Sequence, residues 1–238
     1  MNQFFLRTVQ PALLSLFLLV TLSSQGQDPS LLLQKVKSKM DQVQNYTASA
    51  KMKTDVSFMN VPVSEVNVYY RNPDQFKIKK NNGISMMPKG GVSVNFSALM
   101  TPGRFVAVPA ADATVNGKLL KVIKLLPTDE KGDVILTTLY IDEKNLLINK
   151  AVTNTKENGT YEMDLVYGQF AKWGLPDKVS IVFSTKDYKL PKGITFEYET
   201  NPKPAKEKQT EAGKGKVELT YLSYSINKGV PDNIFSVN

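Results

Sequence analysis

The chain has 238 residues, with 30 Lys plus Arg against 22 Asp plus Glu, and it contains neither Cys nor His. Without Cys it has no disulfide, no thiolate nucleophile, no zinc knuckle and no cysteine to carry a lipid anchor. Without His it has no Ser-His-Asp triad and no imidazole metal ligand. A hydrophobic content of 42% is that of a globular protein, and the length suits a single domain.

The N-terminal segment, Met1 to Gly26, has the three parts of a secretory signal peptide. Arg7 supplies positive charge, and the apolar stretch that follows, Ala12 to Leu22, is too short to span a membrane. Small residues at Ser24 and Gly26 suit a signal peptidase, so we expect cleavage near Gly26; an uncleaved anchor is the alternative. An exported protein without Cys fits a bacterial envelope, which predicts the periplasm.

An amphipathic helix is predicted directly after this segment, beginning near Leu31 with Asp28 or Ser30 as its N-cap. Apolar residues recur there at three- and four-residue spacing, namely Leu32, Leu33, Val36, Met40 and Val43. The helix is expected to run for about four turns and to end before Asn45. Its apolar stripe is expected to pack on the body of the protein; binding to a membrane surface is the alternative.

From Tyr46 onward the apolar residues recur at every second position, which is the period of a half-buried strand. Turn residues separate these runs, which predicts strands at 46–58, 61–70, 76–79, 92–96, 119–126, 134–142, 146–155, 160–170, 178–184, 193–200 and 216–226. Because no helical pattern recurs between them, we expect a mainly β protein whose antiparallel sheet has one buried face. Residues 27–238 are expected to form this one domain.

Two segments lack the alternating pattern. Asn201 to Lys216 is rich in Lys, Pro and Gly and is predicted to be a flexible hairpin loop. Pro109 to Gly117 is predicted to be a second loop or a short helix. The strand pattern is the same on both sides of each segment, so neither segment marks a domain boundary.

The sequence offers little that could carry chemistry. Five carboxylates fall in predicted turns or at outward strand positions, which indicates solvated charge and not a catalytic pair: Asp129, Glu130, Asp142, Glu143 and Asp164. Neither a calcium-loop spacing nor a glycine-rich phosphate loop occurs. The net charge of +8 is evenly scattered, and together with export it argues against nucleic acid. We therefore expect no enzymatic activity, no cofactor and no metal.

The N-terminal half is rich in Met and other apolar side chains that adapt to irregular partners. A curved sheet capped by one helix either fills its inside with such side chains or leaves room for a ligand. Composition alone leaves both alternatives open.

Several segments carry a further signal when they are taken in chain order. They are the helix and first strand LLLQKVKSKMDQVQNYTASAKMK, the strand end YYRNPDQFKIK, the meander LKVIKLLPTDEKGDVILTTLYIDEKNLLINKAVTNTKENGTYEMDLVY, and the closing motifs GLPDKV and INKGVPDNIF. In this order they resemble the LolA/LolB-like superfamily of periplasmic lipoprotein carriers and lipoprotein-sorting proteins. The resemblance covers nearly the whole chain after residue 26.

The resemblance implies an antiparallel half-barrel of about 10 to 11 strands, with the N-terminal helix over a concave face that encloses an apolar cavity. It implies a carrier and chaperone that shelters acyl chains of lipoproteins or lipids, with an envelope transporter and an outer-membrane acceptor as partners. The absence of Cys resembles the soluble carriers and not the lipid-anchored members, and we expect a monomer. The implied cavity residues are Val36, Met40, Met52, Val68, Tyr70, Val94 and Phe96.

One position departs from the superfamily. Its carriers place an arginine for lid control directly before the Pro of the second motif, whereas Asn72 precedes Pro73 here and Arg71 comes one residue earlier. Because one residue reverses the face of a strand, either Arg71 takes this role through a bulge or the lid works differently. The longer C-terminal hairpin also departs, which keeps a second function open: a non-enzymatic envelope interaction or sensor module with a filled core.

Overall fold

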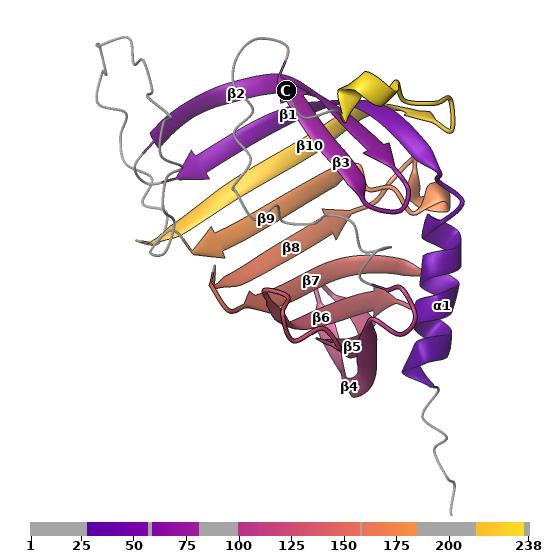
Figure 1. The fold of residues 1–238 in the computed structure, drawn as a ribbon. Helices are drawn as coiled ribbons and strands as arrows, with labels where there is room; N and C mark the ends of the chain where they lie inside the picture. The colour runs from indigo at the N-terminus through magenta and orange to yellow at the C-terminus, as the bar shows by residue number, and fades with distance from the viewer. Residues whose placement is uncertain (1–27, 57–58, 81–99, 158, 185–212, 236–238) are drawn as a thin grey trace, which may run out of the picture.

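The computed structural model describes residues 28–56, 59–80, 100–157, 159–184 and 213–235. These residues form one α-helix, two short 3-10 helices and a single sheet of ten strands (Figure 1). In chain order the elements are α1 (Pro29–Met40), β1 (Asn45–Val56), β2 (Met59–Arg71), β3 (Gln75–Lys80), β4 (Phe105–Val115), β5 (Lys118–Pro127), β6 (Val134–Asp142), β7 (Leu147–Thr155), β8 (Thr160–Val166), η1 (Ala171–Trp173), β9 (Lys178–Ser184), β10 (Lys214–Ile226) and η2 (Asp232–Ile234).

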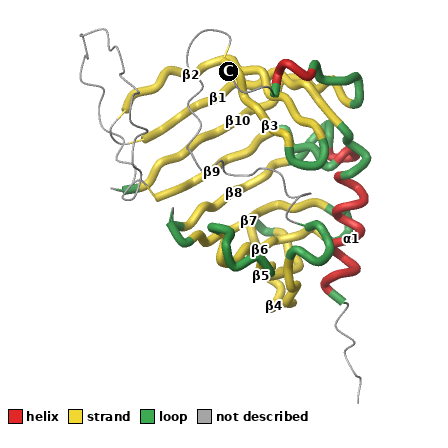
Figure 2. The backbone as a smooth tube through the Cα atoms, viewed as in Figure 1, coloured by secondary structure: helices red, strands yellow, loops and turns green. Residues whose placement is uncertain are grey.

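The strand order across the sheet is β3-β2-β1-β10-β9-β8-β7-β6-β5-β4, so the last strand lies beside the first. Each strand pair is antiparallel. The sheet curves strongly, but its two outer strands, β3 and β4, lie at opposite edges of an open half-barrel (Figure 2). The predicted fold class, a mainly β antiparallel half-barrel with one covered face, is confirmed.

Alternating side chains explain why these segments form strands and why the sheet has one buried face. In β9, Val179, Ile181 and Phe183 are buried, while the residues between them are partly exposed. The register carries this pattern across the sheet, since Leu219 on β10 stands opposite Val179 and is buried as well. The buried residues of the strands and those of α1 form one hydrophobic core.

Helix α1 begins at a clear N-cap and covers one end of the concave face (Figure 1). The Asp28 carboxylate accepts a hydrogen bond from the Ser30 amide at 2.9 Å. Asp28 is one of the two residues that were predicted as the N-cap. Three residues of the predicted apolar stripe are buried, namely Leu32, Leu33 and Val36. The helix ends at Met40, about one turn short of the predicted end before Asn45.

The prediction of a loop or short helix at Pro109 to Gly117 is wrong. Most of that segment belongs to β4, which pairs with β5. The sequence pattern failed there because β4 is an edge strand, whose Ala, Asp and Pro residues are exposed or only half-buried. Edge strands need no alternation of apolar residues, so their pattern does not stand out.

Several predicted segments lie outside the described residues. They are the signal peptide, the strands at 92–96 and 193–200, and the Lys-rich loop up to residue 212. The last three residues of that loop, 214–216, are part of β10.

Candidate functional site

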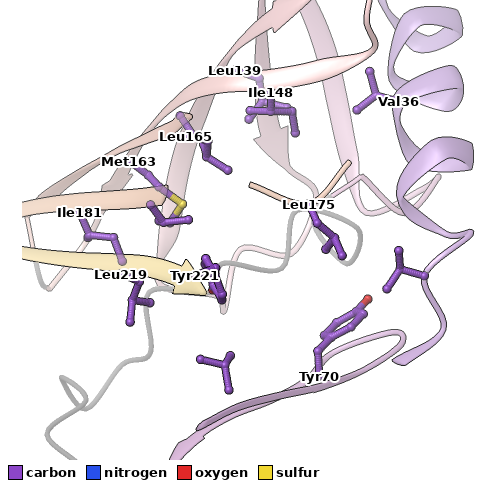
Figure 3. Close-up of a cluster of buried hydrophobic side chains, with 14 of the residues drawn as sticks. Val36, Tyr70, Leu139, Ile148, Met163, Leu165, Leu175, Ile181, Leu219 and Tyr221 are labelled. Atoms are coloured by element: carbon purple, nitrogen blue, oxygen red, sulfur yellow. The ribbon is translucent and has the colours of Figure 1, made fainter. Parts of the chain in front are cut away.

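An apolar pocket lies at the end of the concave face, where the C-terminal end of α1 meets the strands. Its walls come from Met40, Val43, Tyr46, Tyr70, Phe76, Ile148, Leu165, Tyr167, Trp173, Gly174, Leu175, Pro176 and Tyr221. Figure 3 shows the side chains of Leu165, Leu175 and Tyr221 directed toward the same space, with Val36 of α1 on its far side. The pocket therefore joins the helix, both halves of the sheet and the loop that follows η1.

Strand register places the aromatic residues of this wall side by side. Tyr46 on β1 stands opposite Tyr70 on β2, which in turn stands opposite Phe76 on β3. The ring centroids of Tyr46 and Tyr70 are 5.2 Å apart, and Tyr46 lies equally close to the ring of Tyr224. Such pairs add about 0.5 to 1.5 kcal/mol each beyond the area that they bury.

A bulge in the β1–β10 pairing brings Tyr221 of β10 into the same wall and Tyr224 beside it. Ala48 pairs with Tyr224, and after a register shift between Ser49 and Ala50, Ala50 pairs with Tyr221. The shift lets two residues that are three positions apart face the same side, which a regular strand would not allow. The rings of Tyr221 and Tyr224 stack at 4.8 Å. Alanine at the facing positions of β1 leaves room for these rings.

Hydrogen bonds hold the phenol groups in this wall and beside it. Tyr224 donates to the carbonyl of Pro176 at 2.8 Å, and Tyr167 donates to the carbonyl of Ile148 at 2.8 Å. Burial raises the pKa of Tyr221 to about 12 and also raises the pKa of Tyr167. These phenols stay neutral at ordinary pH, so the wall is uncharged.

The free space inside the pocket is about 70 Å³. That volume holds a few water molecules, and it is far below the about 300 to 1,000 Å³ of typical small-molecule pockets. A Cβ at Gly174 would contact the Met40 side chain at 3.6 Å, so the loop after η1 packs directly on the end of α1. A ligand larger than this volume fits only if the walls of the pocket move.

The C-terminal segment ties down the junction between α1 and β1. The Asn227 side-chain oxygen accepts hydrogen bonds from the amides of Gln44 at 2.8 Å and Asn45 at 3.2 Å. Its side-chain nitrogen donates to the carbonyl of Gln42 at 2.8 Å. We call Asn227 and these three partners the C-terminal clamp. Because Val43 lies inside the clamped junction, the clamp fixes part of the pocket wall.

Arg71 anchors the same C-terminal segment to the end of β2. Its guanidinium forms an ion pair with Asp232 at 2.8 Å, donates to the carbonyl of Val230 and lies 5.1 Å from the centre of the Phe235 ring. The register of the described strands runs unbroken through Tyr70 and Arg71, so the alternative of a bulge there is wrong. A lid-control role for Arg71 stays a prediction.

The structure brings two of the seven predicted cavity residues, Met40 and Tyr70, into the pocket wall. Three others are buried in the adjoining core: Val36, Met52 and Val68. The remaining two, Val94 and Phe96, lie outside the described residues. Contact between any of the seven and a lipid stays a prediction.

The motif GLPDKV contributed to the family resemblance, but the sequence patterns did not place it in the pocket wall. Leu175 and Pro176 follow η1, and the loop is held where the Asp177 amide donates to the Val166 carbonyl at 2.8 Å and the Tyr221 amide donates to the Asp177 carbonyl at 2.8 Å. A signal was present, because the only tryptophan of the chain stands directly before this Gly-Leu-Pro sequence. Because binding residues often lie on loops that a rigid scaffold positions, a large aromatic side chain in a loop is a candidate for a site.

Gly168, at the start of this loop, is expected to accept a side chain only at a cost. A Cβ there would lie 2.3 Å from Oδ2 of Asp177, whose Oδ1 is buried without a hydrogen-bond partner in the described part of the chain. We expect Gly168→Ala to lower the free energy of unfolding by about 1 to 3 kcal/mol, measured by urea unfolding. Gly132→Ala is the control, since its Cβ would approach Asp129 no closer than 3.5 Å. Equal losses in the two variants would contradict the clash.

None of the five carboxylates considered for catalysis lines the apolar pocket. Asp142 accepts hydrogen bonds from Asn145, and Asp164 lies 3.7 Å from the Lys150 ammonium. Within the described ranges no three acidic residues gather where they could hold a metal ion. No helix in the same ranges is long and apolar enough to cross a membrane.

No family model and no curated protein matches the sequence. Solved structures do match the fold. A domain named for outer membrane lipoprotein sorting, from Vibrio parahaemolyticus, superposes with a TM-score of 0.56 at 10% identity, over 87% of this chain and 95% of its own. A DUF1329 family protein from Desulfovibrio piger gives 0.52 at 10% identity, over 88% and 98%.

A LolA superfamily protein from Nitrosomonas europaea superposes with a TM-score of 0.50 at 10% identity, over 86% of this chain and 97% of its own. At this identity the likeness shows the fold alone. That fold is LolA-like, so the resemblance seen in the sequence motifs is confirmed at the level of the fold.

Proposed function

We propose that this protein is a periplasmic carrier that shelters acyl chains of lipoproteins or lipids during transfer to the outer membrane. The observation that carries the proposal is the uncharged, aromatic-walled pocket that one helix and one loop close at the end of an open half-barrel. Two proteins that share the fold are named for lipoprotein sorting and for the LolA superfamily, which supports the same role.

The proposal includes the cellular setting expected from the sequence. A signal peptide is removed near Gly26, and residues 27–238 act as one monomeric domain in the periplasm. An envelope transporter loads the domain and an outer-membrane acceptor unloads it. The domain binds and releases its cargo without enzymatic chemistry.

The energy of acyl burial supports loading in spite of the small pocket. Each methylene removed from water contributes about 0.8 kcal/mol, so ten contribute about 8 kcal/mol before costs. Part of that energy opens the pocket, because the loop carrying Leu175 must leave its contact with α1.

The small volume of the pocket favours a second candidate, an envelope interaction or sensor module on the same fold. At about 70 Å³ the pocket is nearly filled by the protein's own side chains. In that case the concave face is simply a core, and the partner is a protein. Chemical cross-linking in cells would then capture that protein, and purified material would contain no acyl chains.

Lipid extraction of the purified protein, followed by mass spectrometry, separates the two candidates. The carrier is expected to contain acyl chains or to take up a fluorescent acyl probe. A protein that is empty and binds no probe would eliminate the carrier and leave the interaction module.

Filling the pocket is expected to weaken acyl binding. Leu175 is 9% exposed and lines the pocket, so Leu175→Trp should weaken probe binding at least about tenfold by occupying the space. Leu175→Ala should bind the probe no more weakly than the wild type. Leu119→Trp is the matched control, because Leu119 is 71% exposed and lines no described pocket. Unchanged binding in Leu175→Trp, with the fold intact by circular dichroism, would contradict the carrier.

A further inference from the structure

A second and larger pocket adjoins the apolar one. It encloses about 530 Å³ between the end of α1, the β4–β5 turn, the ends of β7 and β8, and η1. Leu165 and Tyr167 line both pockets, so they form a shared partition. Tyr167 is held in that position by its hydrogen bond to the Ile148 carbonyl. A ligand bound in the apolar pocket therefore lies next to a space that is large enough for its polar group.

This second pocket, which we call the lysine pocket, is lined by three lysines from separate elements and by the carboxylates of Asp142 and Asp164. Lys39 comes from α1, Lys118 from the first position of β5, and Lys172 from η1. Lys39 donates one hydrogen bond to the Asn145 carbonyl at 2.7 Å, and burial lowers its pKa. An ammonium group has three donors, so Lys39 keeps donors for a ligand. The Lys172 ammonium lies 5.8 Å from the centre of the Trp173 ring. With three lysines against two aspartates in the lining, an anion such as a phosphate is favoured.

The same pocket also offers acceptors. The side-chain oxygen of Asn149 is buried and has no hydrogen-bond partner in the described part of the chain. A buried acceptor without a donor costs about 1 to 3 kcal/mol, so a ligand that supplies a donor gains this energy. Asp142 and Asp164 line the pocket as further acceptors. The lining thus suits a group that combines an anion with hydroxyl or ammonium donors.

We propose that the lysine pocket binds the phosphate headgroup of a glycerophospholipid whose acyl chain enters the apolar pocket. This inference rests on the proposed carrier function and names its cargo class. The phosphate lies among Lys39, Lys118 and Lys172, and the hydroxyl or ammonium donors of the headgroup reach Asn149. The partition formed by Leu165 and Tyr167 marks the boundary between headgroup and tail.

Binding of short-chain lipids to the full chain tests the inference. The probes are dihexanoyl phosphatidylglycerol, the diacylglycerol with the same chains, and inorganic phosphate. We expect the phospholipid to bind at least about tenfold more tightly than the diacylglycerol, and the preference to shrink as salt rises. Equal affinities for the two lipids would overturn the headgroup site while leaving the acyl carrier standing.

Paired charge variants locate the binding site. The variant Lys118→Gln with Lys172→Gln removes two exposed lysines of the pocket and should bring phospholipid affinity down to that for diacylglycerol, with diacylglycerol binding unchanged. The control is Lys35→Gln with Lys124→Gln, which removes two exposed lysines that line neither pocket. Equal losses in both double variants would overturn the site in favour of general charge attraction.

Two further outcomes also decide the question. In the first, inorganic phosphate binds as tightly as the phospholipid, and this binding is lost in the Lys118→Gln, Lys172→Gln variant. The pocket would then be a phosphate site, and the lipid assignment would be overturned. Binding of neither lipid would overturn the carrier function together with the headgroup site.

Discussion

Replacing Asn227 with alanine is expected to lower the free energy of unfolding by about 3 to 4 kcal/mol, because this side chain serves three backbone groups at once. In Asn227→Ala the amides of Gln44 and Asn45 and the carbonyl of Gln42 lose their partners, at about 1 kcal/mol each. The φ of Asn227 is +56°, a left-handed conformation that costs alanine a further ~1 kcal/mol. Urea unfolding at neutral pH measures the loss.

Asn116 provides the matched control for this substitution. It also has a positive φ, of +50°, in the turn between β4 and β5, but its side chain makes no hydrogen bond to a described residue. Asn116→Ala is therefore expected to cost only the ~1 kcal/mol of backbone strain. If the two variants lost the same stability, the C-terminal clamp would contribute nothing.

Stability is also expected to fall between pH 10 and about pH 12 because of buried tyrosines. Burial raises the pKa of Tyr221 to about 12 and that of Tyr70 to about 12, whereas a tyrosine in an unfolded chain ionises near pH 10. Below pH 10 the phenols are protonated in both states, and their contribution is complete. Above pH 10 the unfolded state gives up its protons first, so the contribution is lost as the pH rises through about 12.

For Tyr221 the difference between the two states corresponds to about 2 to 3 kcal/mol. Urea unfolding at several values between pH 9 and 11.5 measures the decline, and Tyr221→Phe is expected to make it shallower. Absorbance at 295 nm counts the ionised tyrosines directly and should show a late group that is missing in Tyr221→Phe. A folded protein whose tyrosines all ionise near pH 10 would contradict the closed pocket.

Strand periodicity predicted much of the fold because most strands are buried on one face. The predicted bounds of β6 and β9 agree with the structure, since turn residues end their alternating patterns sharply. β4 was missed because an edge strand with exposed Ala, Asp and Pro has no alternation to detect. Wherever one face of an element is buried, the local spacing of apolar residues predicted whether the element is a helix or a strand.

The site was harder to predict than the fold, because long-range register builds it. Met40 and Tyr70 were identified since they lie on the apolar face of a predicted helix and strand. Tyr221 faces the pocket through a bulge, and Leu175 comes from a loop, so neither has a local period that marks it. The lysine pocket joins α1, the β4–β5 turn and η1, which are distant in sequence. The lysines of this pocket account for part of the excess of basic over acidic residues in the chain.

The pairing of β1 with β10 has a consequence for the time course of folding. Without β10 the described strands fall into two separate sheets, β1–β3 and β4–β9, so neither half can complete the concave face. Such distant pairing makes folding slow, because a long loop must close before its contacts form. A ribosome must therefore release nearly the whole chain before the half-barrel can close.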